Sequence, residues 1–118
     1  MKSAEMLGIS VHPDVEDKDL DEIFRFIAED DLEAAKRVVM GITKTIEFLG
    51  QYPDLGSAYS HKHPKLQGIY KHTAVKIPGK SYRNYLIFYR IEPDHIRILY
   101  VFRVSRQIPE RMVDELRF

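Results

Sequence analysis

The sequence contains no cysteine and no long apolar run, and each absence excludes a class of protein. Without cysteine, the chain can form neither a disulfide nor a cysteine-ligated zinc site, and a reducing compartment is permitted. No apolar stretch approaches the roughly 20 residues that a transmembrane helix needs. The first eight residues include Glu5 and lack the apolar core of a signal peptide. We therefore expect a cytoplasmic protein that does not contact a membrane.

The formal net charge is zero, but the charges are unevenly distributed along the chain. Residues 1–59 carry 13 acids and 6 bases, whereas residues 60–106 carry 10 bases and only 2 acids. Solvated helix surfaces followed by an ordinary sheet would produce this division. The same division is equally typical of a protein whose basic part binds an acidic partner.

The length of 118 residues and a hydrophobic content of 44% suit one core, so we expect a single domain spanning residues 1–118. Apolar alternation from Leu7 to Val11 predicts a short strand. Helical spacing from Asp14 to Ala28 predicts a first helix. Asp30 followed by Glu33 matches a capping box and predicts a second helix, which ends near Gly50. The first half of the chain is therefore a strand and a helical hairpin.

The second half of the chain changes to the period-two pattern of strands after a polar, basic loop at residues 57–68. Three strands joined by tight turns form an antiparallel meander, and a final helix follows. The predicted strands are residues 69–77, 82–91 and 95–104, and the predicted helix is 107–118. The order is therefore β-α-α-β-β-β-α, an α+β fold.

The segment Tyr85-Leu86-Ile87-Phe88-Tyr89-Arg90 is apolar on both faces, which is typical of a central strand covered on each side. Tyr85 and Tyr89 share one face by period two, and we expect the helices there. Leu86, Phe88 and Arg90 then lie on the opposite face, which we expect to be open.

The basic loop contains His61-Lys62-His63, whose two imidazoles have a spacing that a metal site could use. No third ligand stands at a recognised spacing. A solvated loop or a phosphate-facing patch is therefore favoured over a metal site, and we expect no metal and no cofactor.

Four motifs occur in an order and spacing typical of one protein family. Asp19-Leu20-x-x-Ile23 precedes Phe26-Ile27-Ala28 in the first helix, and Pro53-x-x-Gly56 follows the second. The strand Tyr85–Arg90 and the next, Ile96–Arg106, complete the pattern. The chain thereby resembles the RelE/ParE superfamily of toxins from type II toxin–antitoxin modules, and most closely the ParE-like, plasmid-stabilisation branch. The resemblance implies a helical hairpin packed on an antiparallel sheet, and a cognate antitoxin as partner.

Two activities occur in this superfamily, and Leu86 favours one of them. ParE-like members inhibit DNA gyrase by binding, whereas RelE-like members cleave messenger RNA on the ribosome. In the RelE-like pattern an Arg follows the first Tyr of the central strand, and here that position is Leu86. The resemblance therefore implies a gyrase inhibitor that needs no catalytic group. A ribosome-dependent ribonuclease using His72, Lys76 and Arg106, and an inactive module that only binds its antitoxin, are the alternatives.

The resemblance also implies which residues contact the partners. We assign target contacts to Arg90, Arg103 and Arg106, and antitoxin contacts to Leu86, Phe88 and Arg90. Operator DNA would be reached only through the antitoxin. ParE-like members commonly end the last strand with a Val-x-His-Gly-Arg-Arg-Asp type sequence, and this chain has Arg103 and Val104 where His and Gly are usual. For Arg83, Arg90 and Arg97, which lie at strand ends, the alternative is an ion pair with acids of the helical hairpin or simple exposure to water, so Arg103 and Arg106 are the better candidates for target contact.

Overall fold

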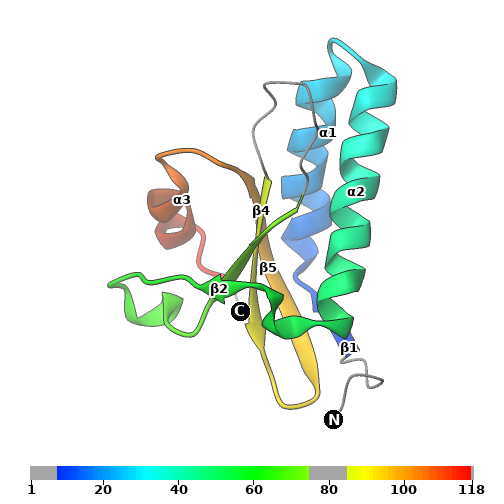
Figure 1. The fold of residues 1–118 in the computed structure, drawn as a ribbon. Coiled ribbons are helices and arrows are strands. Elements are labelled where there is room, and N and C mark those ends of the chain that lie inside the picture. The colour runs from blue at the N-terminus through cyan, green and yellow to red at the C-terminus, as the bar shows by residue number, and fades with distance from the viewer. Residues whose placement is uncertain (1–7, 75–84, 118) are drawn as a thin grey trace.

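The computed structural model describes residues 8–74 and 85–117, which form a sheet between two helical layers. Helices α1 (Asp21–Ala28) and α2 (Leu32–Gln51) cover one face of the sheet, and α3 (Ile108–Asp114) lies on the other (Figure 1). The strands are β1 (Gly8–Val11), β2 (Ser57–Ala58), β3 (Tyr70–Thr73), β4 (Tyr85–Ile91) and β5 (His95–Arg103). This arrangement confirms the predicted α+β fold.

The five strands are ordered β1-β5-β4-β3-β2. Strand β1 pairs with β5 in parallel, and the other neighbouring strands pair antiparallel. The parallel pair is possible because the helical hairpin carries the chain back along the sheet after β1. Strand β2 and the single-turn helices at Pro53–Leu55 and Pro64–Leu66 lie where the sequence predicted an irregular region. The predicted turn at residues 78–81 lies outside the described residues.

The first helix differs from the prediction in its opening turn. Residues Val15–Leu20 form a π-helical turn, and regular α-helix begins only at Asp21. The wider turn places Asp19 against the sheet, where its side chain is buried. The second helix is capped by Asp31, whose carboxylate accepts a hydrogen bond from Ala34 N at 3.0 Å. The predicted cap at Asp30 was therefore wrong by one residue.

Each face of the sheet has its own apolar core. Tyr85, Ile87 and Tyr89 pack against the hairpin, as predicted for the two tyrosines. On the other face Phe88 is fully buried with Tyr100 and Phe102, under α3 and the segment before β3. The expectation that Phe88 lies on an open face is therefore wrong. The last helix, although only seven residues long, covers the face that was predicted to be open.

The hydroxyl of Tyr89 connects the central strand to the turn after α2. It donates to Pro53 O at 2.7 Å and accepts from Gly56 N at 3.0 Å. A Cβ added to Gly56 would lie 2.3 Å from this hydroxyl and 2.8 Å from Lys71 O. The Pro-x-x-Gly turn therefore needs glycine because the strand approaches it closely.

Replacing Tyr89 with Phe should lower the free energy of unfolding by about 1–3 kcal/mol, because Gly56 N and Pro53 O lose a shared partner in a largely buried place. Urea denaturation measures the change. Tyr70 is the matched control, since its ring stacks on Tyr89 while its hydroxyl has no hydrogen bond among the residues that the structure describes. A Tyr89→Phe midpoint equal to that of Tyr70→Phe would contradict the assignment.

Candidate functional site at the free end of strand β5

A buried ion pair lies beside the second half of β5, where β1 no longer pairs. The carboxylate of Asp19 accepts from Arg117 Nη1 at 2.5 Å, from Arg117 Nη2 at 2.9 Å and from Val101 N at 2.9 Å. Arg117 Nη1 also donates to Leu99 O at 3.0 Å. Both side chains are almost completely buried. Two side chains distant in sequence thus satisfy strand groups that a neighbouring strand would otherwise bind.

The aromatic residues of β5 support this ion pair. The guanidinium of Arg117 lies 4.7 Å from the ring centroid of Tyr100. The Tyr100 hydroxyl accepts from Arg117 N at 2.9 Å and donates to Glu115 O at 2.7 Å. These contacts require residues 115–117 to leave the helix after Asp114, which is why α3 is shorter than the predicted 107–118.

Burial and hydrogen bonding act in opposite directions on the ion pair. Burial raises the pKa of Asp19, and the hydrogen bonds from Arg117 and Val101 offset part of that rise. Burial alone would lower the pKa of Arg117, but the hydrogen bonds and charge of Asp19, with smaller contributions from Glu115 and Asp14, raise it. The guanidinium of Arg117 therefore stays charged, and its charge and hydrogen bonds stabilise the buried carboxylate of Asp19.

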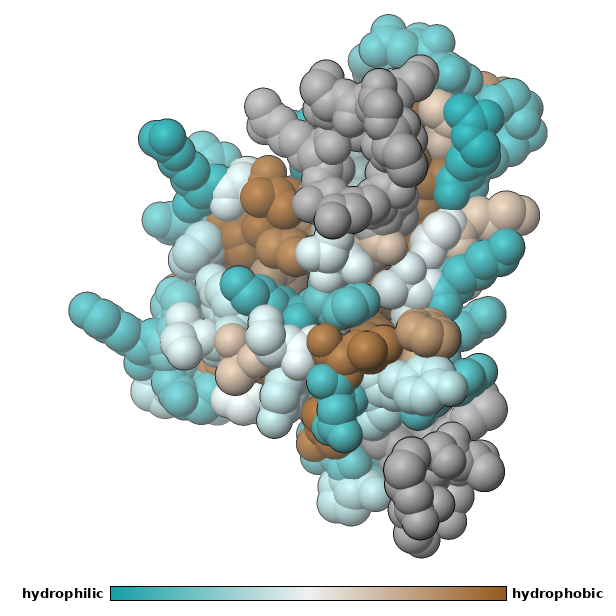
Figure 2. Space-filling view, viewed as in Figure 1, coloured by the Kyte–Doolittle hydropathy of each residue, from teal (hydrophilic) through white to brown (hydrophobic). Residues whose placement is uncertain are grey.

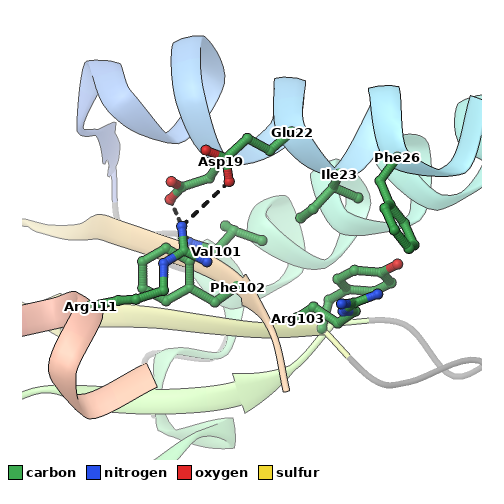
Figure 3. Close-up of a pocket in the computed structure, with 9 residues that line it drawn as sticks. Asp19, Glu22, Ile23, Phe26, Val101, Phe102, Arg103 and Arg111 are labelled. Carbon is green, nitrogen blue, oxygen red and sulfur yellow. Dashed lines mark hydrogen bonds and ion pairs between the residues drawn. The ribbon is translucent and has the colours of Figure 1, made fainter. Parts of the chain in front are cut away.

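A pocket of about 190 Å³ opens next to this ion pair, between α1, α3 and the end of β5. Phe26 and Arg103 lie at one end of it, and Arg111 lies at the other with Glu22 and Asp19 (Figure 3). The Arg103 guanidinium stacks 4.7 Å from the Phe26 ring, and Phe26 is 59% exposed. The pocket thus combines apolar walls with cationic groups at the surface.

The structure separates the three arginines predicted to bind the target. Arg103 and Arg106 are exposed near the end of β5, and Arg106 has no ion pair or hydrogen bond within residues 8–74 and 85–117. Arg90 instead donates to the carbonyls of Lys65 and Gln67 and thereby fastens the basic loop to β4. These hydrogen bonds within the chain explain the presence of Arg90 without any contact to another protein. Its contact with the target or the antitoxin stays a prediction.

Of the apolar residues predicted to bind the antitoxin, only Leu86 retains exposed surface. It is half-buried at the margin of the core under α3, whereas Phe88 lies inside that core. Figure 2 shows hydrophobic side chains exposed between α3 and the upper end of β4. Leu86 therefore remains a candidate contact, and Phe88 is inaccessible in this conformation.

The residues proposed for ribonuclease chemistry do not form a cluster among the described parts of the chain. His72 pairs with Ile87 across β3 and β4, so it lies on the sheet face that carries the helical hairpin. Arg106 follows β5, and no hydrogen bond or ion pair joins it to His72. Lys76 lies outside the described residues.

The histidines of the basic loop hold its backbone. His61 Nδ1 accepts from His63 N at 3.0 Å, and His63 Nδ1 accepts from Lys65 N at 3.1 Å. Within the described ranges, no three His, Cys, Asp or Glu side chains are grouped so as to hold a metal ion. The same residues contain no helix long and apolar enough to cross a membrane.

A further histidine, His12, should make the stability of the fold depend on pH. Burial lowers the pKa of His12, with the charges of Arg117 and Arg97 adding to the effect and those of Asp14 and Asp19 opposing it. Its Nδ1 accepts from Asp14 N at 3.1 Å, and protonation would remove that acceptor. A histidine whose folded pKa is depressed stabilises the protein above its unfolded pKa near 6.5, and the stability is lost as pH falls through the folded value.

We therefore expect the urea midpoint to fall between pH 7.5 and pH 5.5, and the fall to be smaller in His12→Gln. Fluorescence-detected denaturation at the two pH values measures both. An equal fall in wild type and variant would assign the pH dependence to other groups.

The sequence did not indicate that Asp19, Phe26, Arg111 and Arg117 belong to this site. One signal was present for Asp19. It precedes Ile23 and Ile27 by four and eight residues, so it lies on the apolar face of the first helix. A buried carboxylate needs a compensating partner, but nothing in the sequence indicates that this partner is Arg117.

Comparisons with known proteins agree with this architecture. A family model described as "ParE toxin of type II toxin-antitoxin system, parDE" matches residues 9–108. A solved structure from P. aeruginosa, titled "Chromosomal ParDE TA system", is similar with a TM-score of 0.63 and 21% sequence identity, covering 85% of this chain and 98% of that one. At that identity the match shows the fold alone. No curated protein matches the chain.

Proposed function

Because the chain belongs to the ParE toxin family of type II toxin–antitoxin systems, we propose that it inhibits DNA gyrase and that a cognate antitoxin neutralises it. The chain would act as a single domain in the cytoplasm. It would contact operator DNA only through the antitoxin.

The residues on and beside the sheet favour inhibition by binding over catalysis. Leu86 occupies the position where the ribonuclease pattern has an arginine, and it is half-buried against apolar neighbours. Cleavage next to a 2′-hydroxyl needs a base, an acid and a cation held together around the phosphate. Such a set is not assembled by His72 and Arg106, which no hydrogen bond or ion pair joins within the described ranges.

The end of β5 is the best-supported contact surface for the target. Arg103 and Arg106 are exposed there, and neither has a carboxylate partner in the described parts of the chain. They belong to a segment, residues 60–106, that carries ten bases and two acids. An arginine without an internal ion pair has no such pair to break when it binds an acidic surface. The exposure of these two unpaired arginines is therefore the observation that carries the proposal.

A supercoiling assay with purified gyrase tests the function directly. The chain should inhibit supercoiling, and the double variant Arg103→Gln/Arg106→Gln should need about tenfold more protein for the same inhibition, which corresponds to about 1.4 kcal/mol. Arg37→Gln, an exposed arginine on α2, is the matched control. Unimpaired supercoiling together with messenger RNA cleavage at the ribosomal A site in primer extension would identify the ribonuclease instead. Normal growth on expression without antitoxin would indicate the inactive module.

A further inference from the structure

The basic loop at residues 57–68 has no part in the proposed contact at the end of β5. Between Asp54 and Glu92 the sequence has seven lysines and arginines and no acid. Three of the seven lie outside the described residues, and the other four are Lys62, Lys65, Lys71 and Arg90. The loop extends from the sheet on the side of α3 (Figure 1). This stretch of the chain therefore forms a basic surface without acids of its own.

Hydrogen bonds and packing hold the loop in one conformation. In addition to the bonds that His61 and His63 accept, Gln67 Nε2 donates to His61 O at 2.5 Å. Arg90 binds the loop carbonyls from β4, and Leu66 is buried in the core under α3. The loop is thus formed before any partner arrives. A preformed surface loses less conformational entropy on binding.

The exposed side chains of the loop favour phosphate over a protein surface. Leu66 and Ile69 are buried, so the side chains left in water are mainly polar, and they include Ser60, Lys62, Lys65 and Gln67. Figure 2 shows mainly hydrophilic side chains over this part of the molecule. Protein interfaces are built around an apolar and aromatic centre, whereas DNA interfaces are polar and positively charged. The loop has the second composition.

The aromatic ring beside the loop favours duplex over single-stranded nucleic acid. Tyr59 already stacks on His61, with 6.1 Å between ring centroids, and meets Phe88 edge-on at 5.2 Å. The ammonium group of Lys71 lies over the same ring, 5.9 Å from its centroid. Proteins that bind single strands stack the bases on free aromatic rings. Since Tyr59 is occupied, the surface suits a duplex, which presents phosphates with its bases stacked inside.

The acids nearest to the loop leave two of its cations unpaired. Glu110 and Asp114 of α3 line a pocket of about 240 Å³ together with His61. Within residues 8–74 and 85–117, no ion pair joins either acid to Lys62 or Lys71. We expect DNA to approach these lysines from the side of the loop that faces away from α3.

We propose that Lys62 and Lys71 bind phosphates of double-stranded DNA, and that this DNA is the segment held by gyrase. The source of the DNA rests on the proposed function. Phosphate contacts carry no sequence information, so recognition of an operator would still require the antitoxin. The loop would thus add a contact with DNA to the protein contact assigned to Arg103 and Arg106.

Fluorescence anisotropy with a fluorescein-labelled duplex of about 20 base pairs and arbitrary sequence tests the DNA contact without gyrase. The variant Lys62→Gln/Lys71→Gln should bind about tenfold more weakly than the wild type. Its dependence on salt between about 50 and 200 mM should be shallower, by about one unit of logarithmic slope for each lysine. Lys36→Gln/Lys44→Gln changes the net charge equally from exposed positions of α2 and should bind like the wild type. Equal affinity of the two variants, or no binding by the wild type, would overturn the proposal.

Competition with other polyanions tests the choice of duplex DNA. Unlabelled duplex should displace the probe better than single-stranded RNA of the same length or poly-glutamate at equal charge. Stronger competition by the RNA would overturn the duplex assignment and favour the ribosomal alternative. Equal competition by poly-glutamate would overturn the assignment of a phosphate site.

The supercoiling assay tests gyrase as the source of the DNA. Lys62→Gln/Lys71→Gln should need about tenfold more protein than the α2 variant for the same inhibition. Unchanged inhibition by a variant that no longer binds DNA would refute gyrase-held DNA as the partner. The anisotropy titration contains no gyrase, so failure of the DNA contact is distinguishable from failure of the proposed target.

Discussion

Replacing Arg117 with Met should lower the free energy of unfolding by about 3–5 kcal/mol, because it leaves the buried carboxylate of Asp19 without its cation. Asp19→Leu should cost a similar amount, since Arg117 would then be buried without its main partner. Each loss is a large fraction of the 5–15 kcal/mol that is typical of a domain. Urea denaturation followed by circular dichroism measures it.

The double variant Asp19→Leu/Arg117→Met distinguishes a buried charge from general packing damage. Removing both charges eliminates the unpaired ion, so its stability should return towards that of the wild type. Arg25→Met is the surface control, because the exposed pair with Asp21 contributes about 0.5 kcal/mol or less. A double variant that is as unstable as the sum of the single variants would show that the charges are not coupled.

Introducing Asp at Phe88 should prevent the chain from folding, whereas Asp at Leu86 should leave it folded. Phe88 is fully buried between Tyr59, Tyr100 and Phe102. Truncation to Ala there should already cost about 3–5 kcal/mol, and a buried unpaired carboxylate adds more. Leu86 is half-buried at the margin, so a carboxylate there can reach water.

Leu86→Asp therefore separates binding from stability. We expect a cooperative urea transition together with an antitoxin affinity lower by about tenfold, or about 1.4 kcal/mol, measured by calorimetry. Met40→Asp, at an exposed apolar position of α2, is the control for a new surface charge. A folded Leu86→Asp variant with unchanged affinity would remove Leu86 from the antitoxin contact. A folded Phe88→Asp variant would contradict the position of α3 on the sheet.

Local periodicity accounts for the parts of the fold that were predicted correctly. The helical hairpin, the meander and the orientation of Tyr85 and Tyr89 follow from spacings of 3.6 and 2 residues within single elements. Strand β2 is only two residues long, and the π-helical turn before α1 depends on Asp19 reaching the sheet. Neither feature has a periodic signal in the sequence.

The site was predicted less completely than the fold. Arg103 and Arg106 were predicted as target contacts from the charge distribution and the family motif; both are exposed, and their contact with a target stays a prediction. Phe26 and Arg111 complete the pocket from two different helices, α1 and α3, which come together only in the tertiary structure. Arg90 was predicted as a contact, and the sequence did not indicate that it binds loop carbonyls more than twenty residues earlier.

By itself, the sequence determined the order of the longer elements, the family, and the basic character of residues 60–106, because these depend on spacing and composition along the chain. The tertiary structure alone decided that α3 covers Phe88 and that Asp19 meets Arg117 across 98 positions of sequence. The reason is physical. A residue's spacing predicts which face it lies on, but whether that face is open depends on which distant segment can bury against it at a net gain in free energy.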